Sequence, residues 1–141
     1  MVLPAVAGWP IVLQMAKSLT IAVKRIHDMP EAGDGARFLV DRLWPRGVSK
    51  EKAALAAWLK PLSPGEALRK RYHGETVDSD EAWNAFRLDY FAELDAGGEE
   101  VQAALFVLDS AAEAGPVTLL YAAKSAERNN ALALREWLAR R

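Results

Sequence analysis

The chain has 141 residues, of which 51% are hydrophobic and 26% are charged, and its formal net charge at pH 7 is −1. This length is typical of one globular domain, and the near-neutral charge argues against a protein that attracts polyanions with its whole surface. The chain has no cysteine and only two histidines, which excludes disulfides and thiolate zinc sites and leaves few candidates for a Ser-His-Asp triad.

The first 17 residues read as an apolar extension, and we expect the single domain to cover residues 18–141. Residues 1–15 carry no charge. A secretory signal would have a positive start and a small-residue cleavage site, and a membrane-spanning helix would be longer. The alternative is that Ile11 to Leu13 add an edge strand. Because no targeting or membrane segment is recognisable, we expect a cytoplasmic protein.

Three segments have the composition of β-strands. Residues 19–26 and 37–43 are rich in aliphatic side chains, and residues 117–122 form a short apolar run between turn signals. Pro45 marks the end of the second segment, because proline cannot donate a backbone hydrogen bond to a neighbouring strand. The sequence therefore predicts three strands, the last of them buried.

The first of five expected helices follows Ser49. A serine is a suitable N-cap, and the helix would turn Leu55, Trp58 and Leu59 inward. This spacing predicts a helix that extends through residue 59.

The other four helices are expected at about residues 64–72, 79–95, 99–114 and 126–139. Capping-box spacing opens the first two, glutamates suit the start of the third, and glycine-proline ends it. The apolar stripes expected to be buried on the last three are Trp83, Phe86, Tyr90 and Leu94, then Val101, Ala104, Leu105, Leu108 and Ala112, then Leu134, Trp137 and Leu138.

Strands separated by helices favour parallel pairing with helices on the sheet faces. We therefore predict an α/β fold with a small, mostly parallel β-sheet of about three strands. About five helices would flank this sheet in a three-layer α/β/α arrangement.

Charge is distributed unevenly along the chain. Residues 19–73 carry a net charge of +5, residues 74–116 a net charge of −10 and residues 117–141 a net charge of +3. One interpretation is that solvated helix faces simply favour acidic side chains. The other is a basic pocket in a neutral molecule, whose local field would attract an anion.

Functional side chains are expected at the carboxyl ends of the strands, where ligands bind in open parallel sheets. Arginine forks there suit a phosphate or a carboxylate, and lysine adds a point charge. The ligand-binding candidates are Arg25, Arg42, Trp44, Arg46, Lys124, Arg128 and Asn129, and the catalytic candidates are Asp41 and His27. No glycine-rich phosphate loop or cluster of metal ligands is present in the sequence, so we predict no cofactor and no bound metal.

Each candidate also has a structural interpretation. The alternatives are an ion pair of Asp41 with Arg42 or Arg46, a packing role for Trp44, a solvated His27 and a helix cap for Asn129. The sequence alone leaves both interpretations open.

Four stretches of the chain carry a family resemblance. They are VKRIHD (residues 23–28), LVDRLWPRGVSKEKAAL (39–55), WNAFRLDYFAEL (83–94) and GPVTLLYAAKSAERNNALALREWL (115–138). Together they resemble the YeaO-like family of the DUF488 superfamily, which implies a compact α/β domain of the bacterial cytoplasm and no particular activity. The family motif positions on this chain are Lys24, Arg25, Asp41, Arg42, Trp44, Pro45, Arg46, Gly47, Lys124 and Asn129.

One position departs from the family pattern. Relatives usually have histidine before the asparagine that corresponds to Asn129, and this chain has Arg128. A catalytic use of that histidine would be lost here, whereas a role in binding anions would survive the change.

Three functions are therefore open. The leading hypothesis is a domain, either a binding protein or an enzyme, that holds a small anionic ligand with Arg42, Arg46 and Lys124. One alternative is a nucleic-acid-binding protein, whose contacts would come from Lys24, Arg25, Arg42, Arg46 and the basic residues 69–71. The other is a non-catalytic interaction protein that uses its acidic helices. We expect a monomer or a small homo-oligomer with no membrane partner, and nucleic acid is the weaker alternative because of the net charge.

Overall fold

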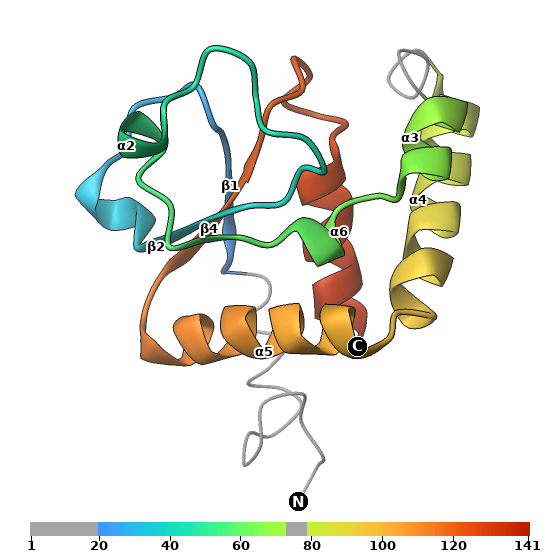
Figure 1. Ribbon diagram of the computed structural model, residues 1–141. Helices are drawn as coiled ribbons and strands as arrows, with labels where there is room; N and C mark the ends of the chain where they lie inside the picture. Colours follow the sequence, from blue (N-terminus) through green and yellow to red (C-terminus); the bar gives the residue numbers. More distant parts are fainter. Residues whose placement is uncertain (1–19, 73–78) are drawn as a thin grey trace, which may run out of the picture.

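A computed structural model describes residues 20–72 and 79–141 and shows a single four-stranded sheet. The strands are β1 (Ala22–Arg25), β2 (Ala36–Leu39), β3 (Ala57–Trp58) and β4 (Val117–Tyr121), in the order β1-β4-β2-β3. Every neighbouring pair is parallel (Figure 1). The predicted α/β class and parallel sheet are confirmed, with β3 as an additional strand. The expected N-terminal extension, the alternative edge strand at residues 11–13 and the proposed helix opening at Asp78 lie outside the described residues.

The inner strand β4 is buried on both faces, as its largely apolar sequence predicts. Leu119 and Tyr121 point to the larger core, and Leu120 points to a smaller core on the other face. The connection from β1 to β2 contains only a short 3₁₀ helix, η1 (Ala32–Asp34), and passes β4, which lies between the two strands.

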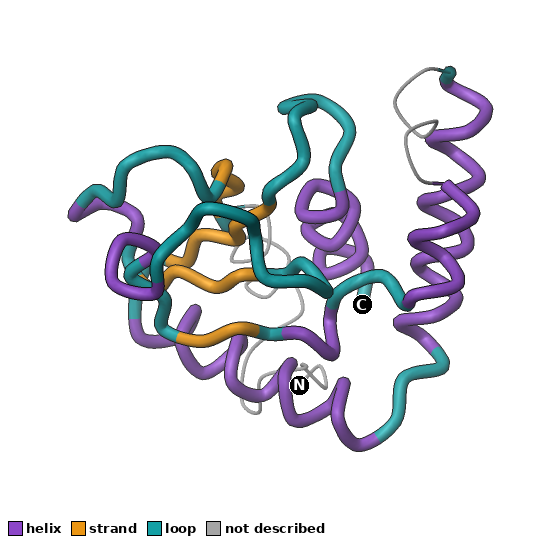
Figure 2. Tube along the Cα trace, turned by 45° about the horizontal axis from the view of Figure 1, so that its top comes forward, coloured by secondary structure: helices purple, strands orange, loops and turns teal. Residues whose placement is uncertain are grey.

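The described residues form five α-helices, in agreement with the predicted number. They are α2 (Lys50–Ala53), α3 (Glu66–Tyr72), α4 (Asp80–Asp95), α5 (Glu99–Ala114) and α6 (Asn130–Arg140), with a second 3₁₀ helix, η2 (Lys60–Leu62). Helices α5 and α6 contact the sheet, α4 contacts α6, and α3 contacts α4. The pair α3 and α4 therefore stands apart from the sheet (Figures 1 and 2). No helix among the described residues is long and apolar enough to cross a membrane.

The two faces of the sheet are covered differently. One face packs against the long helices in a core that includes Phe38, Tyr90 and Leu134. The opposite face is covered by the short α2 and the loop after β2, around Leu39 and Leu120. The apolar stripes predicted on α5 and α6 are confirmed, since their expected inward residues are buried or pack against the core.

The predicted helix after Ser49 is only partly correct. The side chain of Ser49 caps α2 by accepting a hydrogen bond from the Lys52 N–H, but the helix ends at Ala53 because Ala54 adopts a left-handed conformation with φ of 49°. The backbone N–H groups of Ala56 and Leu59 then donate to β2 carbonyls at 2.7 and 2.8 Å. Residues 57–58 therefore pair with the edge of β2 as strand β3, although their apolar spacing favours a helix.

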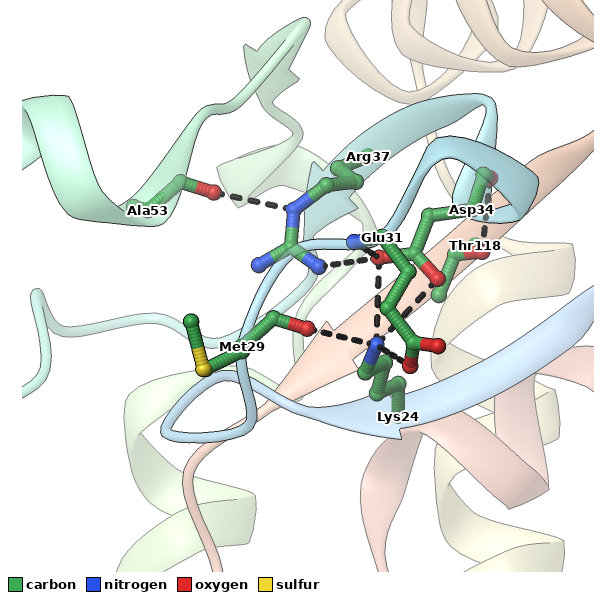
Figure 3. Close-up of polar contacts among 7 residues, drawn as sticks. All are labelled: Lys24, Met29, Glu31, Asp34, Arg37, Ala53 and Thr118. Carbon is green, nitrogen blue, oxygen red and sulfur yellow. Dashed lines mark hydrogen bonds and ion pairs between the residues drawn. The ribbon is translucent and has the colours of Figure 1, made fainter.

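A polar network lies on the sheet face that α2 covers (Figure 3). Asp34 accepts from Arg37 Nη1 at 2.7 Å and from Lys24 Nζ at 3.2 Å, and Arg37 Nε donates to the Ala53 carbonyl at 3.0 Å. Thr118 Oγ1 donates to the backbone carbonyl of Asp34 at 2.8 Å. This network links Lys24 of β1 to Arg37 and Thr118, which lie near the starts of β2 and β4.

Candidate functional site

An open cleft of about 760 Å³ lies where β2 and β4 end. One wall is the loop after β2, a second is the loop after β4 with the start of α6, and α3 and α4 form the wall that faces the sheet. Its volume is in the range of small-molecule sites. The helix pair that stands apart from the sheet therefore completes a cleft at the edge where parallel sheets bind ligands.

Asp41 is partly buried at the inner wall of this cleft, and its carboxylate accepts hydrogen bonds from two of the segments that form the cleft. Its Oδ2 accepts from the Ala122 N–H at 2.9 Å, and its Oδ1 accepts from Asn130 Nδ2 at 3.1 Å. Asn130 Nδ2 also donates to the Val40 carbonyl at 2.8 Å. Within residues 20–72 and 79–141, Asp41 forms no ion pair with Arg42 or Arg46, so the carboxylate instead joins the ends of β2 and β4 to the start of α6.

Burial raises the pKa of the Asp41 carboxyl above its ordinary value, although the hydrogen bonds from Asn130 and Ala122 and the nearby charge of Arg69 lower it. In the polar network on the other side of the sheet, burial also raises the pKa of Asp34. There, however, the hydrogen bonds from the Glu31 backbone, Arg37 and Lys24 outweigh burial and lower it overall. The two carboxyls thus differ in the direction of their shifts.

We expect a carboxyl-carbon NMR titration to separate these two aspartates. The resonance of Asp41 should titrate above the ordinary aspartate pKa and that of Asp34 below it. An Asp41 resonance that titrates below that of Asp34 would contradict the burial and hydrogen bonding described for both groups.

Three cations reach the cleft from separate elements. Arg42 follows β2, Arg69 lies on α3 and Lys124 follows β4. Across residues 20–72 and 79–141, their side chains form no ion pair or side-chain hydrogen bond with another residue. Arg128 also lines the cleft, but its guanidinium pairs with Asp80 at the start of α4. The basic lining therefore contains groups that are available to an anion.

Aromatic side chains line the wall made by α3 and α4. The rings of Trp83 and Phe86 stack with centres 5.7 Å apart and planes 21° apart, and Tyr72 meets Phe86 edge-on at the same distance. Tyr72 also donates to Asp89 at 2.6 Å, which, together with burial, raises the pKa of its hydroxyl. The cleft thus has an aromatic wall on α3 and α4 and a polar wall at the strand ends.

Two other predicted site residues have structural contacts. Asn129 caps α6 by accepting from the Leu132 N–H at 2.9 Å, and its amide donates to the Ser125 carbonyl at 3.0 Å. Trp44 lines the cleft, but its indole N–H donates to the Val48 carbonyl at 2.8 Å and its ring meets Trp58 edge-on. Asn129 therefore acts as a helix cap and Trp44 makes packing contacts, which are the structural roles considered for them from the sequence.

The remaining candidates do not line the cleft. His27 and Arg46 are exposed, and Arg25 donates to the Ala122 carbonyl at 3.4 Å from β1. β4 separates β1 from β2, so the end of β1 opens beside the cleft rather than into it. The sequence predicts candidates at the ends of all the strands, and the strand order decides which of them line the cleft.

Sequence reasoning did not assign Asn130 or the aromatic wall to the site. The sequence predicts Trp83 and Phe86 in a buried stripe and indicates Arg69 only as part of a basic run. The signal for Asn130 was present in the paired asparagines at residues 129–130, of which one caps the helix and the other faces Asp41. Among the described residues, no group of three or more histidine, cysteine, aspartate or glutamate side chains is placed to hold a metal ion.

Comparison with known proteins identifies the family. Residues 20–141 match the family described as the inactive DUF488-N3 subclade. The chain belongs to this family. It is 44% identical over 120 residues to the uncharacterized protein YeaO of Escherichia coli, which covers 85% of this chain and 97% of the relative. Uncharacterized proteins of Mycobacterium bovis and Mycobacterium tuberculosis are 34% identical over 67 residues, or 48% of this chain and 57% of theirs. No solved structure matches the chain.

The match confirms the YeaO-like, DUF488 assignment made from the four sequence stretches. It begins at residue 20 and includes the loop after β2, both strand ends and the start of α6. All of the elements that form the cleft therefore lie within the family domain.

Proposed function

We propose that this domain binds a small anionic molecule, with a phosphate or a carboxylate, in the cleft and does not transform it. The observation that carries the proposal is the convergence of Arg42, Arg69 and Lys124 on one cleft from three separate elements. A concave surface lined by one sign of charge attracts an opposite charge even when the molecule is nearly neutral overall. Guanidinium groups add the fork that matches both anions.

The contacts of Asp41 and the position of His27, the two catalytic candidates, favour a binding role over catalysis. Both oxygens of Asp41 already accept hydrogen bonds that join the strand ends, and His27 lies outside the cleft. The family description as an inactive subclade supports the same proposal. The cytoplasmic location expected from the sequence remains part of this proposal.

The nucleic-acid hypothesis has less support, because several of its cations already have partners. Lys24 contacts Glu31 and Asp34 in the polar network on the other face of the sheet. Lys70 and Arg71 on α3 pair with acidic side chains of α3 and α4. A long polyanion would have to compete with these contacts.

The acidic helices are likewise less available to a protein partner than their composition indicates. Asp95 accepts from the Trp137 indole at 2.9 Å, and Asp109 pairs with Arg141. Part of the negative charge of residues 74–116 is therefore already paired or hydrogen-bonded with residues of the last segment.

Two arginines of the loop after β2 offer a matched test of the proposal. Arg42→Gln and Arg46→Gln remove the same charge, but only Arg42 lines the cleft. We expect isothermal titration with inorganic phosphate, ribose 5-phosphate or citrate to detect binding of at least one anion. Arg42→Gln should weaken that binding about tenfold, the size of one charge-assisted hydrogen bond, and Arg46→Gln should leave it nearly unchanged.

Two results would contradict the proposal. One is the absence of binding for all three anions at low salt. The other is an equal loss in the two variants, because the anion would then respond to the overall charge of the loop and not to the cleft. Tight binding of an oligonucleotide that weakens equally in both variants would favour the nucleic-acid alternative.

A further inference from the structure

The inner wall of the cleft presents hydrogen-bond acceptors. Both amide hydrogens of Asn130 are directed at the protein, one to the Val40 carbonyl and one to Asp41 Oδ1. A carbonyl can only accept, so this pair of contacts also determines the orientation of the Asn130 amide. Among the described residues, Asn130 Oδ1 then has no donor, and Asn130 is one of the residues that line the cleft.

Asp41 adds to this acceptor surface. Each carboxylate oxygen takes one hydrogen bond, from the Ala122 N–H or from Asn130. A carboxylate oxygen accepts two, so each oxygen retains one acceptor position. The place where β2 ends and α6 begins therefore favours a ligand group that carries N–H donors and disfavours one that presents a carbonyl oxygen.

The opposite wall is suited to a flat ring. Phe86 is buried, whereas Trp83 and Tyr72 are partly exposed on the cleft. Aromatic faces favour offset stacking with planar ligands. Arg42 and Lys124, on the loops after β2 and β4, also line the cleft.

We propose that the ligand is a nucleotide whose base carries an exocyclic amino group, such as an adenine or cytosine nucleotide. The base lies against Trp83, its amino edge donates to Asp41 and Asn130, and its phosphate contacts Arg42 and Lys124. This inference rests on the proposed anion-binding function and adds the class of ligand.

Isosteric nucleotide pairs test the amino group without any mutation. AMP and IMP, like CMP and UMP, differ by an amino group in place of a carbonyl oxygen. Isothermal titration of the full chain should show the amino member of at least one pair binding about tenfold tighter than its partner, because the oxo member sets acceptor against acceptor. Equal affinities within both pairs would overturn the inference about the amino edge.

Ribose 5-phosphate and Trp83→Leu test the ring. We expect AMP or CMP to bind more tightly than ribose 5-phosphate, and Trp83→Leu to reduce the affinity of the nucleotide at least fivefold while leaving ribose 5-phosphate unchanged. Phe106→Leu is the control, because Phe106 is 73% exposed on α5 and does not line the cleft. Far-ultraviolet circular dichroism of each variant verifies that it is folded.

The outcomes separate the two proposals. If nucleotides and ribose 5-phosphate bind equally, the proposed binding of the base against Trp83 is overturned and the anion-binding function stands. If adenosine binds as tightly as AMP, the anion-binding function is overturned and the ring site stands. If none of these compounds binds, both proposals fail.

Discussion

Gly35→Ala is expected to lower the free energy of unfolding by about 3 kcal/mol or more, which is among the largest effects of a single methyl group. Gly35 has φ of +64°, and a Cβ at this position would lie 2.1 Å from the backbone oxygen of Pro116. That oxygen also accepts the hydrogen bond from the Ala36 N–H at 3.0 Å, where β2 begins beside β4. The methyl group cannot be accommodated by a side-chain movement, so the two strands would have to separate.

Two other glycines are matched controls for this prediction. A Cβ at Gly33 or at Gly47 would meet nothing within 4 Å, and of these two only Gly47 has a positive φ, of +78°. Gly47→Ala should therefore cost only the left-handed strain of about 1 kcal/mol, and Gly33→Ala should be neutral or slightly stabilising. Urea denaturation of the three variants measures the series, and a Gly35→Ala variant as stable as Gly47→Ala would contradict the close approach of the strands.

Asp34→Ala is expected to cost about 3 kcal/mol, because it leaves Arg37 without its carboxylate in the interior. The Arg37 side chain is 3% exposed and pairs with Asp34 at 2.7 Å. Its Nη2 is buried without a hydrogen-bond partner among the described residues, so the guanidinium already depends on few contacts (Figure 3). The double variant Asp34→Ala with Arg37→Met should be less destabilised than the sum of its single changes.

Glu31→Ala is the control for the buried pair. Glu31 contacts the same Lys24 at 2.7 Å, but its side chain is 73% exposed. A surface ion pair contributes less than about 1 kcal/mol, so this variant should remain close to the wild type in urea denaturation. Equal losses for Glu31→Ala and Asp34→Ala would contradict the importance of burial in this network.

The effect of Asp34 should also depend on pH in a defined direction. Its pKa is lower in the folded protein than in the unfolded chain, so its contribution is present above the unfolded pKa and disappears as pH falls through the folded one. The difference in unfolding free energy between the wild type and Asp34→Asn should thus be constant near neutral pH and shrink below about pH 4. A difference that grows on acidification would show that the Asp34 pKa is raised by folding.

Local sequence determined much of what surrounds the cleft. Ser49 and Asn129 cap helices through contacts within three residues, and the apolar stripe of α5 follows from helical periodicity. The apolar run at residues 117–122 predicts a buried strand, and β4 is one of the two inner strands of the sheet. In each case, the signal and the structure that it predicts are close together in the chain.

The tertiary structure decided the strand order, β3 and the composition of the site. Residues 57–58 join β2 although their spacing favours a helix, and Asp41 meets Asn130, 89 residues later in the chain. β4 enters between β1 and β2, which leaves His27 outside the cleft and brings Lys124 to it, while α3 places Arg69 on the opposite wall. Periodicity and capping report only which face of a segment is buried and where the segment ends. Which distant surfaces then meet depends on the packing of the whole chain, and the sequence patterns contain no local record of it.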